Sequence, residues 1–272
     1  MQPAVHDDRR PQRTLHPIGV VPDHYVWLLV ASAFLAVWLA LYLAHPRYRG
    51  VMLWTSWFTL PFGLTEPLFV AHYWDPPSLF NLAQTTHFDI ESFIFCFGIG
   101  GVAAVLFNVA TGRPIEIGSK TTRDLRLQPV YDALLASPAY VFTIVLLVTR
   151  MPIGAGIAAM IVGAAVRMVY RPGLRAKTCL GGVLFLAYYA LFLLALRILV
   201  PGYIARVWNP DAIGGVRLFG VPLIEPVFAL GVGLFWSGLY EQVVDADESR
   251  HRTDRAVSVA LVARPSRAIF PA

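Results

Sequence analysis

The sequence is short of charged residues. Only 14% of its 272 residues are Asp, Glu, Lys or Arg, whereas 57% are hydrophobic. A soluble domain carries about 25% charged residues, so this composition argues against a soluble protein and indicates a polytopic membrane protein. The formal net charge of +5 then reports on membrane topology, and we expect no nucleic-acid partner.

Cysteine and lysine are scarce too. The two cysteines, Cys96 and Cys179, both lie in apolar segments, and a disulfide framework needs more cysteines in a shorter secreted chain, so we expect free thiols. The two lysines, Lys120 and Lys177, fall in predicted loops. A retinal protein needs a lysine in its last span for a Schiff base, and that class is therefore excluded.

Metal-binding patterns are missing as well. None of the seven histidines lies in a predicted span or forms the i, i+4 pair of a metal-binding helix. The adjacent aspartates Asp7 and Asp8 lie in the polar N-terminus, which argues against a magnesium-dependent membrane prenyltransferase. The segment 98–101, Gly-Ile-Gly-Gly, is apolar with no strand before it, so we expect helix packing there rather than a nucleotide loop. We expect no metal and no organic cofactor.

What the chain does contain is long apolar runs. A spanning helix needs about 20 apolar residues, and seven segments qualify: 25–44, 51–71, 90–110, 133–149, 152–169, 178–200 and 222–241. Basic residues concentrate after the first, third, fifth and seventh of these, whereas loop 72–89 has none. Positive charge stays on the cytoplasmic side, so we expect a bacterial-type inner-membrane protein with its N-terminus outside and its C-terminus cytoplasmic.

Two stretches of the chain resemble each other. Matching residues recur at a constant offset of 134 positions, without a gap, in the pairs Trp74/Trp208, Pro76/Pro210, Ile90/Ile224 and Glu91/Glu225. In each copy a glutamate opens an apolar segment, where a carboxylate is costly unless it is neutral, paired or functional. The duplication suggests two acids that serve one lipid-soluble substrate.

The repeat predicts the architecture. We expect an all-α integral membrane protein with seven transmembrane helices, in which two parallel three-helix repeats, 25–110 and 152–241, are joined by a linking helix within 111–151. Polar segments 1–24 and 242–272 flank them. Repeats related by an axis along the membrane normal commonly place their site at the repeat interface.

These motifs resemble a known family. The first copy offers Glu66, then Trp74-Asp75-Pro76, then Phe88-Asp89-Ile90-Glu91. The second offers Trp208-Asn209-Pro210, then Pro222-Leu223-Ile224-Glu225, then Leu239-Tyr240-Glu241. In order and spacing the chain resembles the heteromeric-type (tandem-domain) membrane lycopene cyclases of carotenoid biosynthesis, and the second copy is the closer match. It departs from that pattern at Ser92 and Pro226, where the family often has acids.

The resemblance implies an enzyme of the intramolecular lyase or isomerase type. An acid protonates the terminal double bond of an acyclic polyene taken from the bilayer, the cation closes to a ring, and a base removes a proton, with no net redox change. Glu225 and Glu91 are the expected acid/base residues, with either role open to each, and Glu66 is expected to support them. We expect Trp74, Trp208, Asp89 and Arg197 to contact the substrate. Aromatic faces and carboxylates stabilise cations, and Arg197 could be the ion-pair partner of an acid.

Structural roles remain open for the same residues. The acids at positions 91 and 225 could serve helix N-termini, Asp89 could be a helix cap, and Glu66 could fill the hydrogen-bonding gap at Pro67. The two tryptophans could belong to an interfacial aromatic belt. Arg197 could pair with an acid or reach the interface, and Glu241 is expected to be solvated.

A second class of function also remains open, a non-enzymatic carotenoid- or lipid-binding membrane module or a transporter on the same fold. The two classes differ in geometry. The enzyme needs Glu66, Glu91 and Glu225 to converge on one lipid-open apolar cavity, whereas scattered or water-lined acids would favour the alternative. The sequence does not define an oligomeric state.

Overall fold

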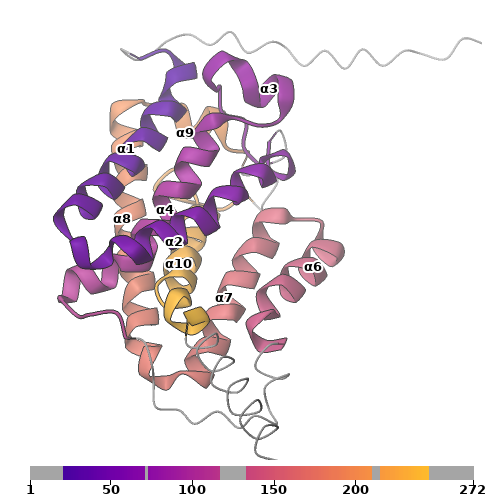
Figure 1. Cartoon of the computed structure of the whole chain (residues 1–272). Coiled ribbons are helices and arrows are strands. Elements are labelled where there is room, and N and C mark those ends of the chain that lie inside the picture. Colours follow the sequence, from indigo (N-terminus) through magenta and orange to yellow (C-terminus); the bar gives the residue numbers. More distant parts are fainter. Residues whose placement is uncertain (1–20, 71–72, 117–132, 210–214, 245–272) are drawn as a thin grey trace, which may run out of the picture.

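The computed structural model describes residues 21–70, 73–116, 133–209 and 215–244. Segments 1–20 and 245–272, loop 117–132, and Pro210 and Asp211 of the second motif lie outside these ranges. Helices dominate, and Figure 1 labels them: α1 (Asp23–Ala44), α2 (Arg49–Thr59), α3 (Leu82–Thr86), α4 (Ile90–Thr111), α6 (Ser137–Thr149), α7 (Pro152–Tyr170), α8 (Arg175–Leu199), α9 (Tyr203–Val207) and α10 (Ile224–Trp236).

Short elements join the helices. The 3-10 helices are η1 (Pro46–Tyr48), η2 (Leu60–Leu68), η3 (Leu79–Asn81) and η5 (Pro172–Leu174). A small antiparallel hairpin, formed by β1 (Arg217–Leu218) and β2 (Val221–Pro222), directly precedes α10. This hairpin is a minor departure from the expected all-α fold.

Five helical segments of the described chain are long and apolar enough to cross a membrane: 23–44, 90–111, 152–170, 172–199 and 224–244. They coincide with the first, third, fifth, sixth and seventh predicted spans and identify an integral membrane protein. The predicted span 51–71 instead contains an eleven-residue α-helix followed by nine residues of 3-10 helix. Pro61 and Pro67 lack the N–H groups that a continuous α-helix needs there. The predicted span 133–149 contains the thirteen-residue α6, so the count of seven remains a prediction.

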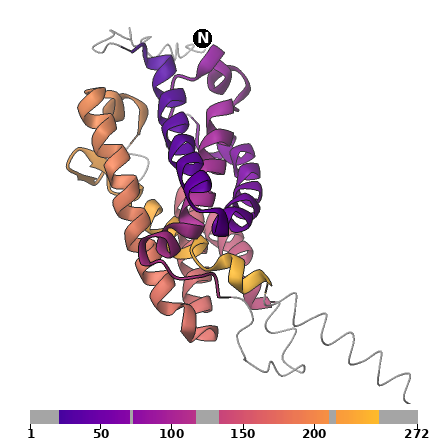
Figure 2. The ribbon, with the colours of Figure 1, turned by 60° about the vertical axis from the view of Figure 1, so that its left-hand side comes forward.

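The helices form two groups around α4 and α10. Helix α4 packs against α1 and α2, whereas α10 packs against α8 and α7, with α6 outermost on α7 (Figure 1). The groups meet where α4 contacts α8 and α10, and α1 lies beside α8 through stacked Phe34 and Phe192 rings (Figure 2). One buried apolar cluster draws side chains from α1, α2, α4, α8 and α10. A second, smaller cluster joins Val26 and Tyr73 to residues of α8 and α9. Among the described residues, both clusters therefore contain side chains from the two groups of helices.

The expectation that 98–101 serves helix packing is confirmed. A Cβ added to Gly100 would overlap the Thr59 side chain, and one added to Gly101 would overlap Trp38 and Ser56. The Trp38 indole N–H donates to Ser56 Oγ (2.9 Å), and that hydroxyl donates to the Phe97 carbonyl (2.8 Å). Glycine thus lets α4 approach α1 and α2 closely enough for this relay to form.

Gly101→Ala is expected to lower stability by about 2–3 kcal/mol, because overpacking of a tight crossing is costly and the Trp38–Ser56 hydrogen bond must break. Thermal unfolding of the detergent-solubilised protein measures the loss. Gly156→Ala in α7 is the matched control, since its Cβ would meet nothing within 4 Å. Equal stability of the two variants would contradict this account of the crossing.

A buried ion pair joins the start of α8 to the segment that follows α10. Lys177 Nζ pairs with Glu241 Oε1, and both side chains are nearly inaccessible. This corrects two predictions: Lys177 lies in α8 rather than in a loop, and Glu241 is buried rather than solvated. Arg167 is also buried and donates to the Leu234 carbonyl and to the Phe235 carbonyl (2.8 Å). Lys177 and Glu241 neutralise each other, and the two backbone carbonyls accept from the Arg167 guanidinium, which is how a membrane helix tolerates charge.

Candidate functional site

The two copies of the tryptophan motif pair with each other. The Asp75 N–H donates to the Val207 carbonyl (2.9 Å), and the Asn209 N–H donates to the Tyr73 carbonyl (2.8 Å). Trp74 and Trp208 form an antiparallel bridge, with ring centroids 5.6 Å apart. Tyr73 corresponds to Val207 and Asp75 to Asn209 at the repeat offset. The two hydrogen bonds are therefore equivalent, each joining the same pair of motif positions in the two copies. Segments 134 positions apart in sequence are therefore adjacent in space.

Glu225 lies in the first turn of α10 and is 4% exposed. Three neutral side chains donate to its carboxyl group. The Trp208 indole (2.8 Å) and the Tyr73 hydroxyl reach Oε1, and the Tyr189 hydroxyl (2.7 Å) reaches Oε2. These donors come from α8 and from both tryptophan loops, so the acid of one repeat is held partly by a residue of the other.

Glu91, the equivalent residue of the first copy, has a different environment. It lies in the first turn of α4 and is fully buried. Its Oε1 accepts from the Leu79 N–H (2.8 Å), whereas its buried Oε2 has no hydrogen-bond partner among the described residues. Two positions that the sequence pairs therefore differ in how many hydrogen bonds they accept.

Glu66 and Asp89 lie next to each other. The Asp89 N–H donates to Glu66 Oε2 (2.8 Å), and Asp89 Oδ1 accepts from the Ser92 N–H (2.6 Å) as the N-cap of α4. Within the described structure, Glu66 Oε1 and Asp89 Oδ2 have no hydrogen-bond partner. Glu66 lies in η2 and is 3% exposed, so its carboxyl group is buried beside that of Asp89.

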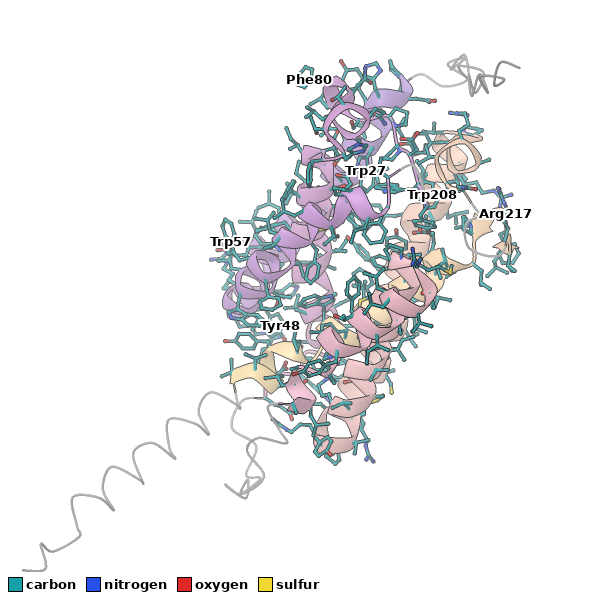
Figure 3. The ribbon with its side chains drawn as sticks, turned by 90° about the vertical axis from the view of Figure 1, so that its right-hand side faces the viewer. Trp27, Tyr48, Trp57, Phe80, Trp208 and Arg217 are labelled. Carbon is teal, nitrogen blue, oxygen red and sulfur yellow. The ribbon has the colours of Figure 1, made fainter. Side chains whose placement is uncertain are left out.

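An aromatic tract connects these positions. Trp27 packs edge-on against Trp74 (4.6 Å between centroids) and contacts Phe95 (5.3 Å). Phe95, one turn after Glu91, packs against Phe34 (5.2 Å) and Tyr189 (6.5 Å). Figure 3 shows Trp27 and Trp208 near the boundary between the two groups of helices. Aromatic faces stabilise cations, and more strongly in a desolvated site.

The remaining predicted residue, Arg197, lies near the end of α8. It donates to the carbonyl of Phe219, at the turn of the hairpin on the side of the molecule where Figure 3 labels Arg217. The structure thus relates Arg197 to the segment that leads into Glu225. Its placement as a substrate contact remains a prediction.

The sequence did not predict two residues of the site, Tyr73 and Tyr189. The only available signal for Tyr73 was its position directly before Trp74, and Tyr189 carries none in a helix rich in aromatic residues. One cavity in the described part of the chain lies elsewhere, bounded by Asn108, Lys177 and Glu241 among others. The shared apolar cavity expected around the three glutamates therefore remains a prediction. In the described part of the chain, no three His, Cys, Asp or Glu residues are grouped as metal ligands.

Comparison with known protein families adds the decisive observation. Residues 152–243 match the lycopene cyclase family. The match spans the second repeat, with Tyr189, Trp208 and Glu225, and it confirms the resemblance over the copy whose motifs are closer to the family. The lycopene cyclase match implies an enzyme, a cyclase of the carotenoid type. Neither a curated protein nor a solved structure matches the chain.

Proposed function

We propose that the chain is a membrane cyclase that closes the acyclic end group of a lycopene-like polyene by proton-initiated ring closure, without net redox change. The observation that carries this proposal is Glu225. It is a buried carboxyl group with three donors, inside the matched segment and beside an aromatic tract. General acid–base catalysis in hydrocarbon needs both a neutral carboxylic acid and a carboxylate that accepts a proton.

The two environments suggest how the acids divide the reaction. In the first repeat, Glu91 and Glu66 each have one buried carboxyl oxygen without a hydrogen-bond partner among the described residues. We assign proton donation to Glu91, with Glu66 and Asp89 in support. Donation to the terminal double bond forms a carbocation, which closes onto the next double bond. Trp74 and Trp208 face this cation in the proposal, and Arg197 positions the hairpin before Glu225.

The wider architecture belongs to the same proposal. The reciprocal bonds between the tryptophan loops support two parallel three-helix repeats, with α6 in the linking segment. With α2–η2 and α6 counted as spans, the chain crosses seven times, with its N-terminus outside and its C-terminus in the cytoplasm of a bacterial-type cell. The substrate enters from the bilayer, and no cofactor takes part.

A lycopene-producing bacterial host that carries this chain tests the proposal. We expect a cyclic pigment, and none with Glu91→Gln, because the amide cannot donate the carboxylic proton. Membranes assayed in deuterated water should yield one deuterium atom per ring formed, since the donated proton ends on carbon. Unchanged lycopene, with the protein verified in the membrane, would contradict the proposal. Carotenoid that copurifies unchanged with the protein would instead favour the binding module.

A further inference from the structure

Glu225 has no positively charged partner among the described residues that contact it. Its donors are two phenols and an indole. Two arginines of the same repeat are engaged elsewhere. Arg206 binds Asp23 (3.0 Å), and Arg197 binds the Phe219 carbonyl. A buried carboxylate is normally retained with a cation, because neutral hydrogen bonds offset only part of its desolvation cost.

We propose that Tyr73, Tyr189 and Trp208 hold Glu225 as an oriented carboxylate whose counter-charge is the carbocation of the substrate, and that Glu225 Oε2 removes the proton that ends the reaction. This inference rests on the proposed function and adds two positioning residues to it, Tyr73 and Tyr189. Neutral donors stabilise an anion without neutralising it, so its field remains available to a transient cation.

The choice of oxygen follows from the hydrogen-bond inventory. An ionised carboxylate offers about four lone-pair sites, two on each oxygen. Tyr73 and Trp208 both donate to Oε1, whereas Tyr189 alone donates to Oε2. One site on Oε2 therefore remains open, next to a tyrosine ring that packs against Phe34 (5.8 Å) and Phe228 (6.2 Å). The open site adjoins the aromatic tract where a polyene cation would be stabilised.

The proton-removal step balances. A carbon–hydrogen bond next to the cationic carbon breaks, its electron pair becomes the ring double bond, and the proton binds Oε2. Glu91 has lost one proton to carbon and Glu225 has gained a different proton from carbon, so the enzyme is reset when Glu225 releases a proton to water and Glu91 takes one up. Because the position of Oε2 decides which proton is removed, the donors also influence where the ring double bond forms.

Tyr73 connects the two repeats at the Glu225 carboxyl group. It belongs to the first copy, 152 positions before Glu225, and its backbone carbonyl also accepts from Asn209. The first repeat thus helps to orient the base of the second. Its equivalent in the second copy, Val207, has no hydroxyl group, so the arrangement cannot be duplicated around Glu91.

The test compares Tyr73→Phe and Tyr189→Phe with Tyr188→Phe. Tyr188 is the matched control, because it is adjacent on α8 and its buried hydroxyl has no hydrogen-bond partner in the described structure. Loss of a donor to a charged acceptor should lower kcat about tenfold to a hundredfold. KM should stay within about twofold because uniform substrate binding is unchanged, and minor ring double-bond isomers should appear. Wild-type kcat and products in both variants, or an equal loss in Tyr188→Phe, would overturn the assignment.

A second measurement does not depend on turnover. Infrared difference spectra of wild type against Glu225→Gln, at neutral pH, should show carboxylate bands and no protonated carboxyl band. Tyr73→Phe and Tyr189→Phe should shift those bands, and Tyr188→Phe should leave them in place. A protonated carboxyl band assigned to Glu225 would refute the inference even if the chain cyclises its substrate. Absence of any cyclic product, with the carboxylate bands present, would instead refute the proposed function.

Discussion

Glu225→Gln is expected to reduce ring closure at least about a hundredfold, the usual scale of general acid–base catalysis. The amide is nearly isosteric with the carboxyl group, so packing around α10 should survive. However, it cannot accept the substrate proton, and its NH2 group would face donors wherever it points. On one side lie Tyr73 and Trp208, and on the other lies Tyr189. Pigment analysis of the lycopene-producing host measures the effect.

The matched control is Glu116→Gln. It makes the same chemical change at an exposed carboxylate that follows α4, at the opposite end of that helix from Glu91. Its cyclic pigment should equal that of the wild type when membrane levels are equal. Wild-type amounts of cyclic pigment from the Glu225 variant would remove this residue from the chemistry and leave it a structural role at the start of α10.

Lys177→Met is expected to destabilise the protein by about 3–5 kcal/mol, because removal of one partner of a buried ion pair leaves the other charge uncompensated. Glu241 is 1% exposed, and its Oε2 has no hydrogen-bond partner in the described structure. Its Oε1 forms the ion pair with Lys177. Thermal unfolding in detergent measures the loss. The double variant Lys177→Met with Glu241→Met should recover most of it, since an apolar pair restores neutrality.

Arg175→Met provides the control for charge removal on the same helix. Arg175 is exposed in the first turn of α8 and donates to the Met168 carbonyl (2.7 Å). Its loss should cost less than about 1 kcal/mol, as for most surface changes. If the Lys177 variant were no less stable than the Arg175 variant, the ion pair would contribute little and the burial of Glu241 would need another explanation.

Predictions from the sequence were most accurate where they rest on a local pattern of residues. Apolar length identified the five segments that are long enough to span, and the glycines at positions 98–101 indicated the close crossing of α4 with its neighbours. Motif order identified the family over the second repeat. Predictions were least accurate where they rest on hydropathy alone, because hydropathy does not report backbone geometry. Residues 51–71 are mostly apolar, yet with proline at positions 61 and 67 the α-helix ends at Thr59 and a 3-10 helix follows over Leu60–Leu68.

Sequence alone determined that this protein lies in a membrane, that two glutamates recur at a fixed offset, and that the second copy resembles a cyclase. These features depend on composition and spacing along the chain. Tertiary structure alone decided that Tyr73 and Tyr189 donate to Glu225, that Lys177 neutralises Glu241, and that Glu91 and Glu225 differ in their partners. Such contacts join residues 12 to 152 positions apart. They arise from the direction in which each packed helix presents its side chains, which no local pattern encodes.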